Sequence, residues 1–258
     1  MSHFQIVTFN LRFLWDGDGK NSFIHRGGLI LEKISTEQPD VIAFQEVVDK
    51  SADFLEQHLP QYNFVYAHRD AEYIGEGLVI AYKRAKFNLF SLDTFWLSDT
   101  PQVAGSVLEG QSPCARVCQS ALLQEKQTHR VLRVVNVHLD YISQEIAVKQ
   151  MRLILAHLDE KLFHEKTPFF ILGDFNSEPD SETIALCHSS THPRLCELTE
   201  SVTHTFHAFG TRQDACKIDY VFADTATAQK AYTVTRWEDE VNGIYLSDHY
   251  PLSVELEF

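Results

Sequence analysis

Polar side chains of the kinds that bind divalent metals and transfer protons recur along this chain, each at or near the end of an apolar, strand-like run. They are carboxylates, histidines and carboxamides, found at Asn10, Glu46, His138, Asp174, Asn176, Asp219, Asp248 and His249. Carboxylate and amide oxygens suit Mg²⁺ or Mn²⁺, and acids and imidazoles beside such a metal can activate water against a phosphate ester. The set therefore points to metal-assisted hydrolysis of a phosphate ester.

Each motif also has a purely structural interpretation when it is taken alone. Asp174 and Asn176 are good turn residues, and Asp248 with His249 would suit a turn that carries a surface histidine. His138 would serve as a hydrogen-bonded core histidine. The functional interpretation is favoured only because all of these motifs occur together.

Two acidic residues are hard to explain without a partner. Glu46 follows directly after the apolar run 41–44, where an unpaired buried carboxylate would cost roughly several kcal/mol. Asp219 lies in the run 218–222 among strong β-formers, where a carboxylate again needs a partner. A metal ion or a basic group would serve Glu46, and a histidine is the obvious partner for Asp219.

The spacing of apolar residues predicts the elements that must position these groups. Alternating or short apolar runs predict strands at residues 4–9, 41–44, 62–67, 78–82, 87–97, 116–124, 129–138, 169–172, 218–222, 232–237 and 252–256. Helical spacing predicts helices at 25–37, 51–59, 143–164 and 180–187, with Ser51 and Ser143 as N-caps. Hairpins, such as the one expected at 125–128, dominate the middle of the chain. We therefore expect an α+β fold, an α/β sandwich of two packed mixed β-sheets flanked by outer helices.

Length and composition favour one domain over residues 1–258. The chain has 258 residues, of which 44% are hydrophobic and 22% charged, and this is enough to build a substantial core. Neither a Pro-, Gly- or Ser-rich linker nor an internal repeat divides the sequence.

The formal net charge of −14 limits the partners of the chain. Proteins that grip many phosphates of a long nucleic acid usually carry a basic surface, because counterion release supplies most of that affinity. This sequence has no cluster of lysine and arginine of that kind. We therefore expect a small phosphorylated substrate or a short nucleic acid, and the charge argues against long duplex DNA.

The sequence favours a cytoplasmic protein without a membrane partner. No apolar run approaches the roughly 18–20 residues that span a bilayer, and residues 1–7 lack the basic and apolar parts of a signal peptide. The five cysteines are odd in number and lack the paired spacing of a zinc site, so we expect reduced thiols. The oligomeric state is left open.

In their order along the chain, these motifs resemble the endonuclease/exonuclease/phosphatase superfamily, which has the deoxyribonuclease I-like fold. The resemblance covers nearly the whole chain, from Thr-Phe-Asn at 8–10 through Gln-Glu at 45–46, Gly-Asp-Phe-Asn at 173–176 and Ile-Asp-Tyr-Val-Phe at 218–222 to Ser-Asp-His at 247–249. Residues 94–101 and 205–207 most resemble small bacterial stand-alone members akin to the deadenylase and nocturnin branch. The resemblance implies a four-layer sandwich.

The resemblance also implies which residues would bind metal and water. Glu46, with Asn10 and Asp248, would hold Mg²⁺ or Mn²⁺ through hard oxygen ligands. Asp174, with Asn176, would position the attacking water and is one candidate for the base that deprotonates it.

Two histidines would act on the phosphoryl group in the same scheme. His249, paired with Asp219, and His138 would contact the phosphoryl oxygens as proton donors and stabilise the charge that grows in the transition state. The resemblance leaves open whether Asp174 or His249 is the base, and whether one metal or two are needed.

Further side chains are candidates for substrate binding: Arg116, Arg26, Trp96, Tyr141 and His207. Arg116 would fork onto a phosphate oxygen, or else lie solvated at a strand edge. The aromatic residues, together with Phe209, would form a wall for a base or sugar, with packing in the core or rim as the alternative. Glu76 would either orient His138 or serve as a turn carboxylate.

Three functions are compatible with these expectations. The first is a metal-dependent phosphoesterase that hydrolyses a phosphodiester or phosphomonoester of a small or short substrate by in-line attack of water. The second is a nuclease, in particular a 3′–5′ RNA exonuclease. The third is a binding module that has lost catalysis on a shared fold.

Overall fold

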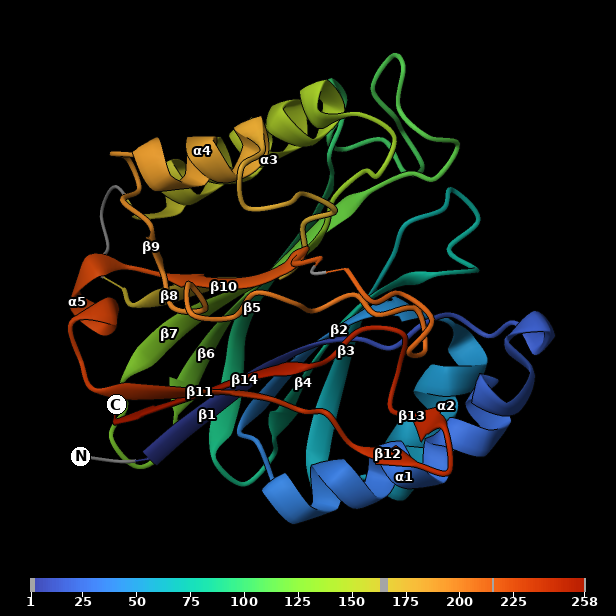
Figure 1. Ribbon diagram of the computed structural model, residues 1–258. Coiled ribbons are helices and arrows are strands. Elements are labelled where there is room, and N and C mark those ends of the chain that lie inside the picture. Colours follow the sequence, from blue (N-terminus) through green and yellow to red (C-terminus); the bar gives the residue numbers. More distant parts are fainter. Residues whose placement is uncertain (1–2, 163–166, 215, 258) are drawn as a thin grey trace.

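Two six-stranded mixed sheets lie face to face in the computed structural model, which describes residues 3–162, 167–214 and 216–257 (Figure 1). The first sheet has the order β11 (Tyr232–Arg236), β14 (Leu252–Glu257), β1 (His3–Asn10), β2 (Val41–Val47), β4 (Gly77–Lys83) and β3 (Tyr62–His68). The second sheet has the order β5 (Phe87–Trp96), β6 (Val117–Glu125), β7 (Val131–His138), β8 (Phe169–Asp174), β10 (Asp219–Ala223) and β9 (Cys196–Glu197).

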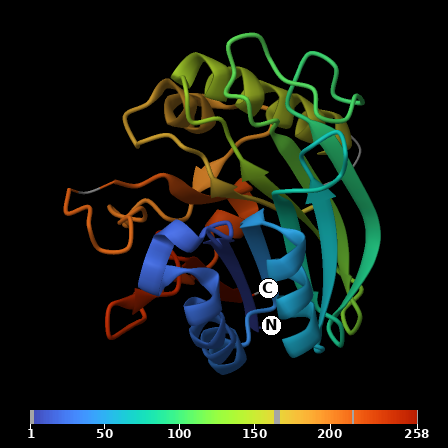
Figure 2. The same cartoon turned by 90° about the vertical axis from the view of Figure 1, so that its right-hand side faces the viewer.

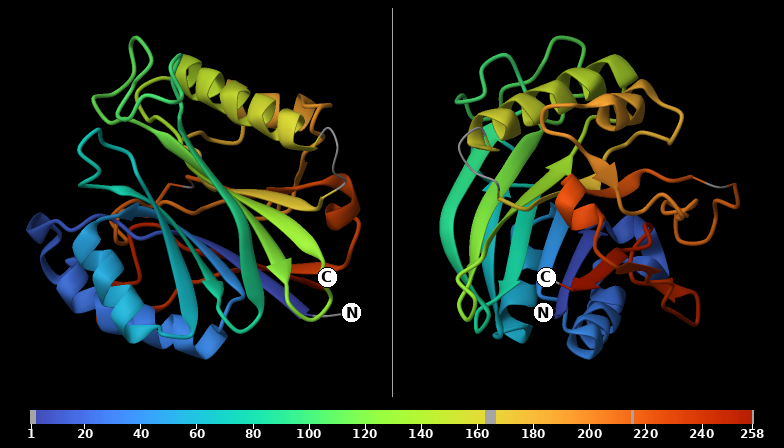
Figure 3. Two further views of the ribbon diagram at one scale, coloured as in Figure 1. Left: turned by 180° about the vertical axis from the view of Figure 1, so that it is seen from behind. Right: turned by 90° about the vertical axis from the view of Figure 1, so that its left-hand side faces the viewer.

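Helices cover the outer face of each sheet, which makes four layers (Figure 3). The first sheet packs against α1 (Phe23–Glu37) and α2 (Asp49–His58), and the second against α3 (Gln144–Leu162) and α4 (Glu182–Ser189). The smaller elements are η1 (Asp16–Asn21), α5 (Thr225–Ala228) and the ribbon of β12 (Glu240–Val241) and β13 (Ile244–Tyr245). The expected α/β sandwich is thereby confirmed.

No helix within the described part of the chain is both long and apolar enough to cross a membrane.

The space between the sheets is apolar except near one end. Phe4, Ile80 and Phe170 belong to the apolar cluster that joins the two inner faces. Towards the ends of β2 and β7, the side chains of Gln45 and Asn136 meet across the sheets at 2.8 Å. Asn136 also donates to two backbone carbonyls of the opposite sheet, at 2.9 and 3.1 Å. Because every polar group in this contact needs a partner, the network fixes how the strand ends of the two sheets face each other.

The helix boundaries correct one predicted cap. The helix expected to start after Ser51 begins at Asp49, and Val48 occupies the N-cap position. Ser51 lies in the first turn, where its hydroxyl accepts the N–H of Val48 at 3.1 Å. The hydroxyl of Ser51 therefore accepts an N–H group that precedes the helix, and it does not cap the N–H groups that follow Ser51. For this reason the predicted start of the helix is two residues late.

The cap predicted for the longest helix is confirmed, since the hydroxyl of Ser143 accepts the N–H of Ile146 at 3.2 Å. The predicted end of this helix, His164, lies outside the described residues.

Gly173 permits the close approach of β8 to β7, and we expect it to tolerate no side chain. A Cβ atom at this position would lie 1.9 Å from the carbonyl oxygen of Val137, and its φ of +147° is one that L side chains rarely adopt. Gly173→Ala should therefore lower the free energy of unfolding by about 3 kcal/mol, measured by urea denaturation. Gly28→Ala is the matched control, because nothing lies within 4 Å of its Cβ in α1. The Gly28→Ala variant should have a free energy of unfolding up to about 1 kcal/mol higher than the wild type. Equal effects of the two substitutions would contradict the argument.

Candidate active site

The strand ends that carry the predicted polar residues converge at one end of the sandwich. Asn10 ends β1, His138 ends β7 and Asp174 ends β8. His138 and Asp174 are paired in the parallel register of β7 and β8, while Asp219 at the start of β10 pairs with Asp174 in antiparallel register. Figure 2 faces this end of the molecule, where the long loops lie opposite the two termini. The topology thus brings together residues that are far apart in the sequence.

Asp174 is the centre of the cluster and is almost completely buried. Its Oδ2 atom accepts the side-chain amide of Asn10 at 3.0 Å. The same oxygen lies 3.5 Å from Nε2 of His138 and 3.8 Å from Nε2 of His249. Its other oxygen accepts the backbone N–H of Asn176 at 2.8 Å, as an Asx turn would. One carboxylate oxygen therefore faces two imidazoles and an amide.

His249 and Asp219 form a buried pair. Nδ1 of His249 lies 2.8 Å from Oδ2 of Asp219, so the partner expected for this carboxylate is present. Burial alone would lower the pKa of His249, but the negative charges of Asp219 and Asp174 outweigh it and raise that pKa to about 10. The imidazole is therefore a cation that can donate from Nε2 toward Asp174 or toward a group bound beside it.

His138 has the opposite character. Burial, followed by the positive charges of Arg116 and Arg69, lowers the pKa of His138 well below its ordinary value. The two histidines that flank Asp174 thus differ in charge, one neutral and one cationic.

Glu46 is held at the mouth of the cluster by two donors. Its Oε1 accepts from the side chain of Asn10 and its Oε2 from the backbone N–H of Phe13, both at 3.0 Å. Glu46 has a φ of +58° and Asn176 a φ of +47°. Such left-handed conformations are costly for non-glycine residues and persist where the surroundings require them, often at functional sites.

The cluster carries an excess of acid that suits a cation. Burial and the neighbouring charge of Asp219 raise the pKa of Asp174 to about 7. Burial also raises the pKa of Asp248, with Glu46 adding to the effect. One donor atom each from Glu46, His138 and Asp174 lies within 4.8 Å of the others. This donor set fits a divalent metal ion, whose charge would relieve the repulsion between the carboxylates.

The other two predicted metal ligands border this set. Asp248 accepts from the hydroxyl of Ser247 at 3.1 Å and lies 3.7 Å from the guanidinium of Arg12. Oδ1 of Asn10 accepts the N–H of Arg12 at 3.0 Å, which leaves one lone pair for a metal. Their roles as ligands stay predictions.

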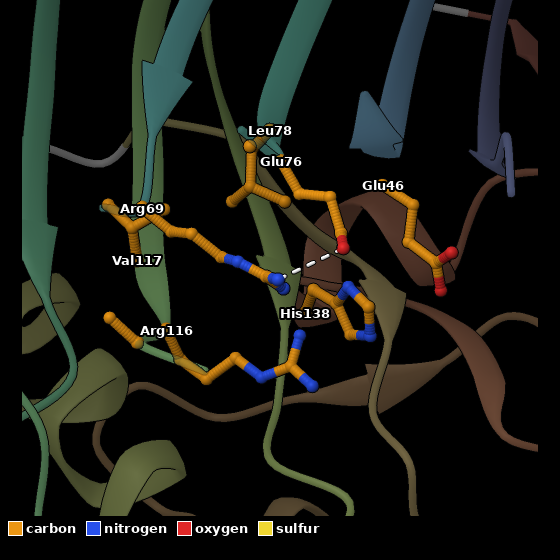
Figure 4. A pocket seen from close by; sticks show the side chains of 9 residues that line it. Glu46, Arg69, Glu76, Leu78, Arg116, Val117 and His138 are labelled. Carbon is orange, nitrogen blue, oxygen red and sulfur yellow. Dashed lines mark ion pairs between the residues drawn. The ribbon is translucent and has the colours of Figure 1, made fainter. Parts of the chain in front are cut away.

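A hollow beside the cluster is lined by charged side chains (Figure 4). Glu46 and His138 stand on one side of it, and Arg69 and Arg116 reach in from the other. Glu76 pairs with Arg69 at 3.0 Å and lines the same hollow as His138, and its suggested role of orienting His138 stays a prediction. Arg69 was not anticipated, because an arginine just after a strand looks like an ordinary solvated turn residue.

Arg116 lies at the site, as expected for a phosphate contact. The residue is buried, being only 4% exposed, and its side chain makes no hydrogen bond to any described residue. Its guanidinium carbon lies 5.9 Å from the ring centroid of Tyr141, a side chain that is 55% exposed. Tyr141 is therefore an exposed ring beside Arg116, and it is not one of the residues that line the hollow.

Arg26 is not at the site, and its predicted contact with substrate is wrong. The residue is fully buried and donates to the carbonyl oxygens of Asn21, Leu11 and Leu246 at 2.6, 3.0 and 2.7 Å. These bonds tie the loop after β1 to the segment before Asp248. The sequence could not reveal this, since a helical arginine is usually solvated.

Trp96 and His207 pack into the protein and do not form the predicted aromatic wall. Trp96 is 7% exposed, and its indole N–H donates to the carbonyl oxygen of Arg69 at 2.6 Å. His207 is 2% exposed and stacks on Tyr250 with ring centroids 3.8 Å apart. Trp96 thus supports the backbone of Arg69, which agrees with packing in the core or rim, the alternative given for these aromatic residues.

Comparison with known proteins agrees with the fold. The chain is similar over its whole length to the crystal structure of an endonuclease/exonuclease/phosphatase from Bacteroides vulgatus, with 25% identity, a TM-score of 0.91 and full coverage of both chains. It has the fold of a Bacteroides thetaiotaomicron mannosyl-6-phosphatase, at 22% identity and a TM-score of 0.86, covering 99% of this chain and 100% of that one.

The catalytic domain of human nocturnin, solved with a bound sulfate anion, shares the fold as well. Its TM-score is 0.72 at 19% identity, over 99% of this chain and 94% of the nocturnin chain. The family model described as endonuclease/exonuclease/phosphatase matches residues 7–249, a span that runs from β1 to His249 and contains every residue of the cluster. The chain therefore belongs to the endonuclease/exonuclease/phosphatase family.

Proposed function

We propose that this chain is a divalent-metal-dependent phosphoesterase that hydrolyses a phosphate ester of a small or short substrate by in-line attack of water. One observation carries the proposal: Oδ2 of Asp174 faces Asn10, His138 and His249 at 3.0, 3.5 and 3.8 Å. A buried carboxylate between two imidazoles is an arrangement that can orient a water molecule and move its proton. A carboxylate oxygen of Glu46 lies within 4.8 Å of the ligand atoms of His138 and Asp174, so the three side chains could bind one metal ion.

Each residue has a role that follows from its contacts. Glu46 and Asp174, with Asn10 beside them, would hold Mg²⁺ or Mn²⁺, which supplies positive charge for the phosphoryl oxygens when bound. Asp174 orients the attacking water, with Asn176 fixing the carboxylate through its backbone N–H.

The histidines and Arg116 act on the phosphoryl group. His249, oriented by Asp219, and His138 donate hydrogen bonds to oxygens that gain charge in the transition state. The buried guanidinium of Arg116 contacts a phosphoryl oxygen as well. Asp174 takes the proton of the water, because the imidazolium of His249 has no free nitrogen lone pair to accept it.

Several features support a small substrate. The net charge is −14, and the mannosyl-6-phosphatase with the same fold acts on a phosphorylated sugar according to its name.

We further propose that the protein works in the cytoplasm, where its five free cysteines would stay reduced. A 3′–5′ RNA exonuclease is the second candidate, and cleavage of a short RNA in the same assay would favour it.

Removing one metal ligand should weaken the response to metal. We expect hydrolysis of p-nitrophenyl phosphate or bis-p-nitrophenyl phosphate to need Mg²⁺ or Mn²⁺ and to stop with EDTA. Glu46→Gln should raise the metal concentration for half-maximal rate by about tenfold or more, since a carboxylate ligand is lost. The measurement is initial rate against metal concentration.

Glu160→Gln, an exposed position in α3, serves as the control and should match the wild type. Metal binding by calorimetry without turnover of any ester would favour a binding module. Rates that are equal with metal and with EDTA would refute the proposed function.

A further inference from the structure

Two arginines from different strands of the two sheets face one hollow beside the candidate metal ligands. Arg69 follows the last residue of β3 and Arg116 precedes the first residue of β6. Figure 4 shows both guanidinium groups directed toward the space next to His138, with Glu46 on the far side. The walls between them include Leu78, Ala115 and Val117. The hollow therefore combines a cationic end with small apolar walls.

The arginine end of the hollow has guanidinium donors that the protein leaves without acceptors, although Glu46 and Glu76 in the lining and Asp70, 3.9 Å from Nε of Arg69, offset the formal charge. Glu76 neutralises one arginine through its contact with Arg69 at 3.0 Å. The side chain of Arg116 has no hydrogen-bond partner in the described parts of the chain, and Nε of Arg69 is also buried without one. Buried guanidinium donors without acceptors are unfavourable, and the oxygen of an anion bound between the two arginines would supply the missing acceptor. The fold maintains this arrangement, since Trp96 anchors the backbone of Arg69.

The number of donors indicates the kind of anion. A phosphodiester has two non-bridging oxygens and one negative charge, and both of its esterified oxygens continue into covalent groups. A phosphomonoester has three non-bridging oxygens and about two charges near neutral pH. One oxygen toward the metal ion that Glu46 and Asn10 would hold, and one toward His249, would leave a third for the arginine end. On a diester, an ester group would have to enter the space between Arg69, Arg116 and the apolar walls.

From this geometry we infer that Arg69 and Arg116 form a subsite for the third oxygen of a terminal phosphate, so that the enzyme prefers phosphomonoesters to phosphodiesters. The inference rests on the proposed function and names its substrate class. In the reaction, the oxygen of water forms a bond to phosphorus and the bond from phosphorus to the leaving oxygen breaks. One water proton goes to the leaving oxygen, which departs as an alcohol, and the other stays with the inorganic phosphate released.

The test compares two esters with one leaving group. For the wild type with Mg²⁺, we expect kcat/KM for p-nitrophenyl phosphate to exceed that for the p-nitrophenyl ester of thymidine 5′-phosphate. Arg69→Gln and Arg116→Gln should each lower kcat/KM on the monoester by about tenfold to a hundredfold, as for the loss of a charge-assisted hydrogen bond. The loss on the diester should be at least about tenfold smaller than on the monoester, because the diester has no third non-bridging oxygen for the two arginines. Arg69→Lys should recover only part of the loss, because an ammonium lacks the planar fork.

Two further measurements separate a substrate contact from a structural role. Arg116→Gln should melt at or above the wild-type temperature, because an unpaired buried charge is removed. Inorganic phosphate should bind the metal-free wild type in calorimetry, and each glutamine variant should bind it about tenfold more weakly. Arg152→Gln, exposed on α3, is the matched control for both measurements.

The outcomes distinguish this inference from the proposed function. If no ester is hydrolysed but phosphate binding depends on both arginines, the subsite stands and the phosphoesterase proposal fails. If esters are hydrolysed with metal but the arginine variants lose equal activity on monoester and diester, the phosphoesterase stands and the subsite is refuted. Phosphate binding that is unchanged in both variants refutes the subsite as well.

Discussion

Asp174→Asn should lower kcat by about 10³-fold or more while leaving the protein folded. The substitution keeps the size of the side chain and an oxygen for the N–H of Asn176. It removes the charge that faces His138 and His249, so the water is neither oriented nor deprotonated and the metal loses a ligand. The measurement is kcat on p-nitrophenyl phosphate at saturating Mg²⁺ or Mn²⁺.

The stability of the same variant provides its internal check. Burial and the nearby charge of Asp219 raise the pKa of Asp174, which means that the ionised form is disfavoured in the folded protein. Removing this charge should offset the lost hydrogen bonds, so the melting temperature without metal should not fall below the wild type. Asp159→Asn, exposed on α3, is the control for activity. An Asp174→Asn protein with wild-type kcat would exclude Asp174 from the chemistry.

Asp219→Asn and His249→Gln should each lower kcat by roughly 10²–10⁴-fold, and the double variant should be little worse than the more damaging single one. The reason is that the two side chains act as one unit, with Nδ1 of His249 2.8 Å from Oδ2 of Asp219. Without Asp219 the imidazole loses its orientation and its charge. A double-mutant cycle in kcat at saturating metal measures this coupling.

His188→Gln is the matched control for this cycle. His188 also pairs with a carboxylate, Glu197, at 3.1 Å, but it lies on α4 with its side chain 47% exposed. Its kcat should stay within about twofold of the wild type, as expected for an exposed pair. Effects of Asp219→Asn and His249→Gln that multiply in the double variant would show that the two residues act independently.

The sequence could predict most elements of this fold because their signals are local. Alternation and short apolar runs identified all of the longer strands, and the four long helices were placed to within about two residues at their starts. The elements that were missed are η1, with six residues, and β9, β12, β13 and α5, with two to four residues each. Such short segments contain too few residues to show a period.

For the candidate site as well, the sequence could predict some residues and not others. The pairing of Asp219 with a histidine could be expected, because a carboxylate among β-formers requires a partner, and the family resemblance pointed to His249 among the 13 histidines of the chain. The position of Arg69 at the site could not be expected, because only the packing of β3 beside β6 brings it next to Arg116. Arg26 was misjudged for the same reason, since one of its carbonyl partners, Leu246, lies 220 positions away in sequence.

The sequence by itself determined the chemical types of the site residues, their order and the apolar pattern that places each at a strand end. These are properties of single residues and their near neighbours. Only the tertiary structure decided which groups share a space: one oxygen of Asp174 between two histidines, and two arginines around a hollow next to Glu46. The physical reason is that burial and charge at these positions depend on contacts between distant segments, and those contacts set both the pKa values and the unpaired donors.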